Sequence, residues 1–102
     1  MVRIFLLHNL APGVSHEQYE REAASKYIPM LRSFGSICDF KLYRSLGAPP
    51  GTAPYAYVGI IDVESIASYE ADRQTATYCR LEQDWAKQIA DTILVVGEEL
   101  QI

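Results

Sequence analysis

Three short segments of this chain are apolar at consecutive positions rather than at alternating ones. They read IFLL from Ile4, YVGII from Tyr57 and TILVV from Thr92. Short runs rich in branched side chains are typical of β-strands, and an unbroken apolar run indicates a strand covered on both faces. The sheet built from these strands therefore needs a layer on each side, and this requirement restricts the possible folds more than any other feature.

Two stretches between the apolar segments follow the helical period. The first begins after Ser15, and Gln18 three residues later completes the pattern of a capping box. Pro29 predicts a break in this helix near residues 27–28, because proline lacks a backbone N–H. The second begins after Ser65, and its predicted apolar stripe is Leu81, Trp85 and Ile89.

A fourth strand is predicted over SICDFKLYRS, where apolar and polar residues alternate. Its predicted buried face holds Cys38, Phe40 and Leu42. Residues 46–54, rich in glycine and proline, predict a loop. The element order is then β-α-β-β-α-β, so we predict an α+β, ferredoxin-like fold in which two helices cover one face of a four-stranded antiparallel sheet. One domain is expected to span residues 1–102.

The second face of this sheet has no cover within the predicted fold. Roughly ten apolar side chains would face water there, at a cost of about 1.5–3 kcal/mol each. Monomeric proteins rarely expose an apolar patch of that extent. The simplest cover is the same sheet of a second copy, so we predict a homodimer in the form of a dimeric α+β barrel. The alternative is a monomer that leaves the patch exposed.

Charge and composition exclude several classes of function. The net charge is −4 at pH 7, which does not suit the basic surface required for nucleic acid. The apolar runs are shorter than the ~20 residues that span a membrane. Cys38 and Cys79, in a chain without a secretion signal, indicate free and buried cysteines of a cytoplasmic protein. The cysteines and histidines lack the spacing of a metal site, so no metal is predicted.

His8 is the strongest candidate for a catalytic residue. It ends the first strand, and an imidazole suits proton transfer near neutral pH. We predict that it lines a cavity between the sheet and the first helix, with Asn9 and Tyr27 as catalytic partners. The alternative is a strand-end histidine that only makes a hydrogen bond. His16, at a helix terminus whose dipole disfavours the imidazolium, is expected to be solvated.

Seven tyrosines in 102 residues are a high proportion. Each offers a flat apolar face and one hydroxyl group, so a cavity lined by tyrosines suits a planar aromatic molecule. The alternative is that tyrosines, like the single tryptophan, fill a small core. Arginine can hold a ligand carboxylate with two parallel hydrogen bonds. The predicted substrate-binding residues are Tyr19, Arg32, Tyr43, Tyr57, Tyr69 and Trp85.

Several stretches together resemble the RedY-like, or HapK, family of dimeric α+β barrels. They are HNL, APGVSHEQYE, YIPMLRSFGSICDFKLYR and ILVVGEEL, and they span nearly the whole chain. The resemblance implies a homodimer without a metal or organic cofactor. It also implies a tailoring role on pyrrole- or indole-derived intermediates of bacterial prodiginine and bisindole pathways. The family pattern has an acid and a tyrosine directly before the proline, whereas this chain has SKYIP, so that acid has no counterpart here.

Three functions remain open at this point. One is a cofactor-free enzyme that steers an aromatic intermediate through cyclisation, decarboxylation or proton transfer. Another is a cofactor-independent monooxygenase that acts on an electron-rich aromatic. The third is a binding protein without turnover. Polar groups that converge on the cavity would favour an enzyme, whereas a wholly apolar cavity would favour a binding protein.

Overall fold

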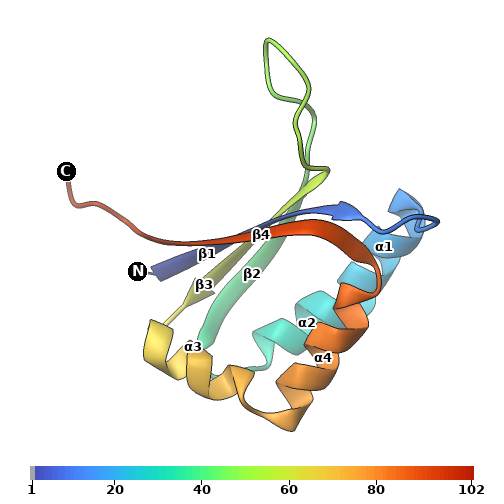
Figure 1. Ribbon diagram of the computed structural model, residues 1–102. Coiled ribbons are helices and arrows are strands. Elements are labelled where there is room, and N and C mark those ends of the chain that lie inside the picture. The colour runs from blue at the N-terminus through green and yellow to red at the C-terminus, as the bar shows by residue number, and fades with distance from the viewer. Residues whose placement is uncertain (1) are drawn as a thin grey trace.

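The computed structural model describes residues 2–102 and contains one four-stranded antiparallel sheet. Its strand order is β2-β3-β1-β4, and all helices lie on one side of it (Figure 1). The strands are β1 (Val2–Leu10), β2 (Ile37–Arg44), β3 (Tyr57–Val63) and β4 (Ile89–Glu98). The helices are α1 (His16–Glu22), the π-helical turn η1 (Ala23–Tyr27), α2 (Ile28–Arg32), α3 (Ile66–Arg73) and α4 (Ala76–Ala86). The predicted α+β class and element order are confirmed.

The first helical segment changes its geometry where proline was expected to interrupt it. The Ser15 hydroxyl accepts the backbone N–H of Gln18 and starts α1. A π-helical turn follows, in which the N–H of Ile28 donates to the carbonyl of Ala23. Pro29 then occupies the first turn of α2, where its missing N–H breaks no helical bond. The helical segment continues from this π-turn into α2, which leads to β2.

The second helical segment consists of two helices with separate N-caps. Ser65 caps α3, and Thr75 caps α4 by accepting the backbone N–H of Tyr78. The predicted stripe is confirmed at Leu81 and Trp85, which are both buried. The assignment of Ile89 to this stripe was wrong, because the chain leaves the helix at residue 86 and β4 begins at residue 89.

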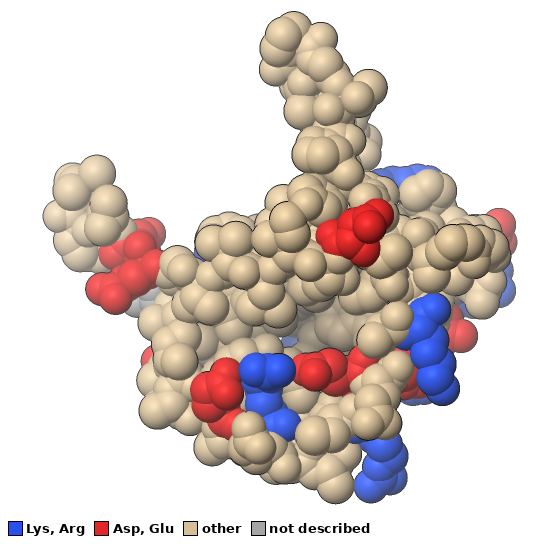
Figure 2. All heavy atoms as spheres, in the orientation of Figure 1, with Lys and Arg blue, Asp and Glu red and all other residues tan. Residues whose placement is uncertain are grey.

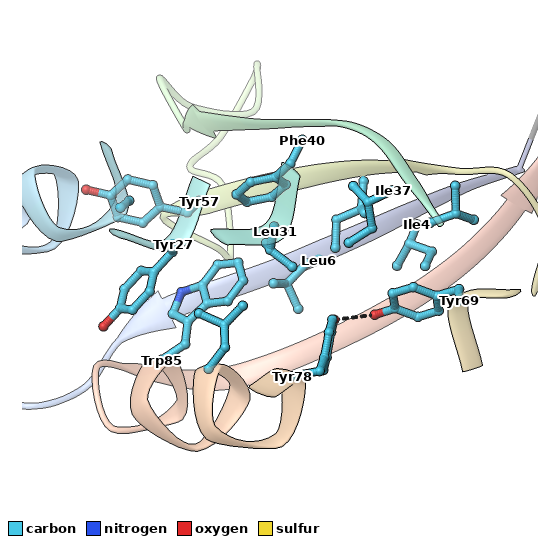
Figure 3. Packing of buried hydrophobic residues seen from close by; sticks show 14 of the residues in the cluster. Ile4, Leu6, Tyr27, Leu31, Ile37, Phe40, Tyr57, Tyr69, Tyr78 and Trp85 are labelled. Carbon is cyan, nitrogen blue, oxygen red and sulfur yellow. Dashed lines mark hydrogen bonds between the residues drawn. The ribbon is translucent and has the colours of Figure 1, made fainter. Parts of the chain in front are cut away.

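Alternate residues of the central strands point toward the helices and form the core (Figure 3). Packing is tight there at one glycine. A Cβ atom on Gly59 would lie 3.1 Å from Cε1 of Phe40, so a larger residue would press against that ring. The buried residues of β1 and β3 on this face are Ile4, Leu6, His8, Tyr57, Ile61 and Val63.

The opposite face of the sheet, which we call the open face, carries apolar side chains away from the helices. On β1 and β3 these side chains are partly exposed, and they are Phe5, Leu7, Val58 and Ile60. On β4, Ile93 and Val95 are 46% and 48% exposed. The inference that consecutive apolar residues place apolar groups on both faces is therefore confirmed.

Both cysteines are exposed, and the prediction that they are buried was wrong. In β2 the register to β3 shifts between Ile37 and Asp39. This irregularity turns Ile37 into the core in place of Cys38. Cys79 follows the buried Tyr78 on α4 and is exposed.

Candidate functional site

A cavity of about 710 Å³ lies between the sheet and the helices α3 and α4. Figure 2 shows the hollow between the strands above and the helices below. It forms because the helices do not cover β4. Leu94 and Val96 point to the helix side, opposite Leu6 and Ile4 of β1, yet they are 53% and 51% exposed. The apolar part of the lining includes Leu6, Leu31, Ile61, Ile66, Leu81, Ile89, Leu94 and Val96.

Three aromatic side chains, Tyr69, Tyr78 and Trp85, line this cavity. The hydroxyl groups of Tyr69 and Tyr78 lie 2.8 Å apart and share a hydrogen bond. Burial raises the pKa of both phenols, so both stay protonated at neutral pH. One hydroxyl hydrogen serves the mutual bond, which leaves the other available as a donor to a bound molecule.

Charged side chains also line the cavity. Glu70, Arg73 and Glu82 come from the helices, and Asp91 comes from the start of β4. Arg73 forms ion pairs with both glutamates, at 3.2 Å to Glu70 and 3.5 Å to Glu82. Asp91 has a left-handed backbone conformation, with φ of 53°. It lies where the register between β1 and β4 shifts, so this irregularity helps to place a carboxylate beside the hollow.

His8 does not line this cavity. Its side chain is fully buried, and its Nε2 lies 2.7 Å from the Tyr19 hydroxyl. The same hydroxyl accepts the indole N–H of Trp85 at 2.8 Å, so its own hydrogen is free to go to His8. The Nδ1–H of His8 then donates to the carbonyl of Leu6 at 3.1 Å. Burial lowers the pKa of His8, which agrees with this neutral form.

The expected cavity between the sheet and the first helix is thus filled by aromatic rings. The His8 ring stacks on Tyr57 at 5.7 Å and meets Tyr19 edge-on. Tyr27 stacks on Trp85, and its hydroxyl accepts the side-chain N–H of Gln88 (Figure 3 shows the two rings). Neither His8 nor Tyr27 reaches the hollow beyond Trp85, so their predicted catalytic roles stay predictions.

Asn9 fixes the base of the loop between β2 and β3. Its side-chain oxygen accepts the backbone N–H of Ala56 at 2.8 Å, and its amide N–H₂ donates to the carbonyl of Pro54 at 3.2 Å. The same amide donates to Asp91 at 3.3 Å. The rest of the loop projects away from the sheet in Figure 1. These bonds give Asn9 a structural task, and its predicted catalytic role has no geometric support at the large cavity.

His16 is exposed, as the sequence predicted, and its ring also makes a hydrogen bond. Its Nδ1 lies 2.8 Å from the Tyr57 hydroxyl, which itself donates to Glu20 at 2.6 Å. Glu20 also pairs with Arg44 at 3.4 Å. A second, smaller cavity of about 360 Å³ includes Asn9, His16 and Arg44 in its lining. The hydroxyl of Tyr57 therefore contacts His16 and Glu20, and Tyr57 does not line the large cavity.

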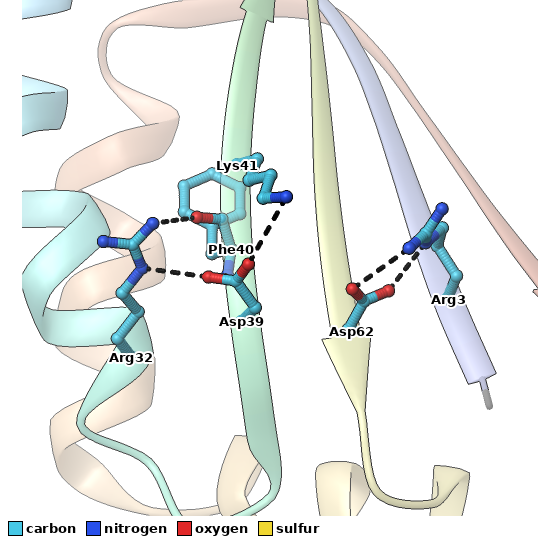
Figure 4. Close-up of polar contacts among 6 residues, drawn as sticks. All are labelled: Arg3, Arg32, Asp39, Phe40, Lys41 and Asp62. Carbon is cyan, nitrogen blue, oxygen red and sulfur yellow. Dashed lines mark hydrogen bonds and ion pairs between the residues drawn. The ribbon is translucent and has the colours of Figure 1, made fainter.

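Two other predicted binding residues lie outside the large cavity (Figure 4 shows the first). Arg32 pairs with Asp39 at 3.2 Å and donates to the carbonyl of Phe40 at 2.8 Å, so its guanidinium is already occupied. Tyr43 is 52% exposed on β2. Of the six predicted binding residues, the structure places only Tyr69 and Trp85 in the lining.

The other groups of this site were not predicted from the sequence. Tyr78 stands three residues before Leu81 and seven before Trp85, so the helical period of α4 was a signal that could have found it. Arg73 follows Tyr69 by four residues on α3 in the same way. Asp91 and Leu94 carry no comparable signal, because their place at the hollow depends on how β4 pairs with β1.

A family model described as REDY-like protein HapK matches residues 2–100. The chain belongs to this family. The resemblance seen in its sequence motifs is thereby confirmed. No curated protein sequence matches the chain.

Solved structures agree with the family in fold. HapK from Hahella chejuensis is 22% identical with a TM-score of 0.83, and the match covers 100% of this chain and 95% of that one. A hydroxynitrile lyase from Passiflora edulis is 9% identical with a TM-score of 0.83, covering 99% and 94%. A protein from Bacteroides fragilis, described as dimeric with a ferredoxin-like fold, is 14% identical with a TM-score of 0.68, covering 96% and 95%.

Within residues 2–102, no group of three or more histidine, cysteine or acidic side chains is arranged to hold a metal ion. No helix of the described chain is long and apolar enough to cross a membrane.

Proposed function

We propose that this member of the HapK family is a tailoring protein of bacterial secondary metabolism that acts without a cofactor. It binds a flat aromatic intermediate in the large cavity and steers its reaction. The cavity carries the proposal: its volume of about 710 Å³ falls in the range of small-molecule sites, and three aromatic side chains line it. The family supplies the expected chemical class, a pyrrole- or indole-derived molecule as in prodiginine or bisindole formation.

The lining groups suit proton transfer, cyclisation or decarboxylation. The hydroxyl pair of Tyr69 and Tyr78 can donate a hydrogen bond to an oxygen that gains negative charge during the reaction. The raised pKa values make these phenols donors rather than bases. Glu82 and Asp91 supply carboxylates that can accept a proton. The aliphatic floor orients the molecule and limits access of water.

A binding protein without turnover is the second candidate, and one observation favours it. The floor of the cavity is made by aliphatic side chains, whereas its charged groups already pair with each other or with Asn9. The monooxygenase alternative predicts oxygen uptake when an anthrone- or quinol-type substrate is added. A steering enzyme or a binding protein predicts no uptake.

Occupancy of the cavity can be tested with N-phenyl-1-naphthylamine, a neutral aromatic probe whose fluorescence rises in apolar surroundings. We expect saturable binding to the wild type. Leu94→Trp, which places a large ring in the hollow, should weaken binding at least about tenfold. Gln83→Trp adds the same ring at an exposed position of α4 outside the lining and should leave binding unchanged. Absence of saturable binding, or equal losses in both variants, would contradict the proposal.

We also propose that the chain forms a homodimer through the open face. Ile93 and Val95 are about half exposed on this face, beside the partly exposed Phe5 and Ile60. An apolar surface of this extent on a small domain is typical of an interface. The dimeric ferredoxin-like protein from Bacteroides fragilis has a similar fold. The mass of the wild type in solution, measured by light scattering at micromolar concentration, tests this proposal.

A further inference from the structure

The charges at the large cavity are unbalanced. Three carboxylates, on Glu70, Glu82 and Asp91, stand against the single guanidinium of Arg73. At neutral pH the lining therefore has a surplus of two negative charges. Figure 2 shows acidic side chains both above and below the hollow, with basic ones among and beside the lower group.

The one positive charge of the lining is already neutralised. Nη1 of Arg73 lies 3.2 Å from Glu70, and Nη2 lies 3.5 Å from Glu82. The guanidinium also lies over the ring of Tyr69, 6.0 Å from its centre. A ligand carboxylate would have to displace one of these glutamates, and the displaced carboxylate would then repel it at short range.

Asp91, in contrast to Glu70 and Glu82, has no ion pair with a cation among the described contacts. Its side-chain contact with the amide of Asn9, at 3.3 Å, comes from a neutral donor. A neutral N–H satisfies an oxygen but leaves the negative charge uncompensated. The strand side of the cavity thus presents a carboxylate that no cation offsets among the described contacts.

The aromatic walls act in the same direction. The face of an aromatic ring is negative because of its π-electrons and attracts cations. In this lining the ring of Tyr69 already lies near a cation, the guanidinium of Arg73. The carboxylates of Glu70, Glu82 and Asp91 are exposed to solvent, so salt can screen their interaction with a bound charge. Size, apolar floor, aromatic walls and negative lining all fit one kind of molecule.

We propose that the cavity selects aromatic molecules that carry a protonated nitrogen and discriminates against aromatic carboxylates. This inference rests on the proposed function, because it assigns the charge of the molecule that the cavity binds. It replaces the expectation that an arginine would hold a ligand carboxylate.

Three probes of similar shape test the selection. They are 1-naphthylmethylamine, which is cationic at pH 7, 1-naphthalenemethanol, which is neutral, and 1-naphthaleneacetate, which is anionic. Each is titrated against bound N-phenyl-1-naphthylamine. We expect the cation to bind about tenfold tighter than the alcohol, and the anion at least about tenfold weaker. The preference should shrink as salt rises from about 0.02 M to 0.5 M, because the open mouth admits screening ions.

Paired variants separate the lining from the charge of the whole protein. Glu82→Gln with Asp91→Asn should reduce the preference for the cation about tenfold, and asparagine tolerates the left-handed backbone at position 91. Glu17→Gln with Glu99→Gln changes the net charge equally at exposed positions outside the lining, and it should preserve the preference.

The outcomes distinguish this inference from the proposed function. Binding of the neutral alcohol without a preference for the cation would overturn the charge selection alone. Equal loss of preference in both double variants would also overturn it, because the effect would then come from net charge. Failure of every probe to bind would overturn the proposed function itself.

Discussion

Ile60 and Ile61 are neighbours on β3 with the same side chain and opposite surroundings. Ile61 faces the helices and is buried, whereas Ile60 lies on the open face and is partly exposed. Consecutive apolar residues therefore do not mean equal burial within one chain. At Ile61 the fold itself covers the helix side of the sheet. The open face carries the apolar side chains of a core, but no second layer of this chain covers it.

The helix side is itself uneven. Beneath α1 and α2 the rings of Tyr19, Tyr27 and Tyr57 pack closely, and their hydroxyls all have partners. Beside β4 the same face is hollow, and Leu94 is about half exposed. The tight end can hold a buried histidine in one protonation state, whereas the hollow end has room for a ligand.

The largest expected effect comes from placing a charge on each face of β3. Ile61→Arg should abolish folding, because a buried unpaired charge costs several kcal/mol, comparable with the whole stability of a small domain. Ile60→Arg should instead prevent dimerisation and lower the melting temperature, since an apolar interface stabilises the folded state. Circular dichroism melting and light scattering at micromolar concentration measure the two effects.

For the wild type, light scattering should give about twice the chain mass of 11.5 kDa. A monomeric wild type under these conditions would contradict the proposed homodimer. Ile60→Arg should then change the melting temperature little. Leu94→Arg, on the helix side of β4, is the matched control that should leave dimerisation intact.

A smaller effect is expected from removing one hydroxyl group on the helix side. Tyr19→Phe leaves the indole N–H of Trp85 and Nε2 of His8 without their partner, so it should cost about 2–4 kcal/mol of unfolding free energy. Tyr43→Phe, at an exposed tyrosine of β2, should change stability by less than about 0.5 kcal/mol. Urea unfolding followed by the fluorescence of Trp85, the single tryptophan, measures both. Similar values for the two variants would contradict the hydrogen-bond chain.

Substitution of His8, which belongs to these hydrogen bonds with Tyr19 and Trp85, can distinguish two roles for its side chain. If His8 transfers a proton during catalysis, His8→Ala should lower the rate about 10²–10⁴-fold in a folded variant. If it mainly holds Tyr19 and Trp85 in place, the variant should lose stability while its folded fraction keeps most of its activity. His16→Ala is the control in both cases. Activity of the stably folded fraction, once a substrate is found, separates the two roles.

The smallest effect is a dependence of stability on pH. Burial lowers the pKa of His8 in the folded state, so below about pH 6.5 the unfolded chain binds more protons than the folded one. The unfolding free energy should therefore fall as pH decreases from about 6.5 towards the lowered pKa, by at most about 1.4 kcal/mol per pH unit, and be unaffected above about pH 7.5. His8→Asn should remove this component, and His16→Asn should retain it. An unchanged slope in His8→Asn would rule out His8 as its source.

Much of the local structure could be predicted from residue patterns. Ser15 and Ser65 act as caps, and Pro29 marks the change of helix geometry. His8 shares one face of β1 with Ile4 and Leu6, as the two-residue period of a strand requires. These features depend on neighbours within a few residues, so the pattern contains the needed information.

The errors have a common cause. Cys38 faces outward because the register of β2 against β3 is irregular. Ile89 has the spacing of the apolar stripe of α4, but it lies beyond the end of this helix and begins β4. His8 was placed beside a cavity because it ends an apolar strand, yet Tyr19 and Trp85 from two helices close over it. Each error concerns a residue whose surroundings come from distant parts of the chain.

The sequence by itself determined the α+β order, the caps and the apolar character of both faces of the sheet. It did so because these properties follow from local periodicity and from the side chains themselves. Only the tertiary structure decided where the hollow lies. The strand pairing of β4 and the path of α4 leave Leu94 uncovered and bring Asp91 and Glu82 to the same cavity. Tyr19 and Trp85, from two different helices, bury His8. Packing between elements that are far apart in the chain determines these positions, so no local sequence pattern can predict them.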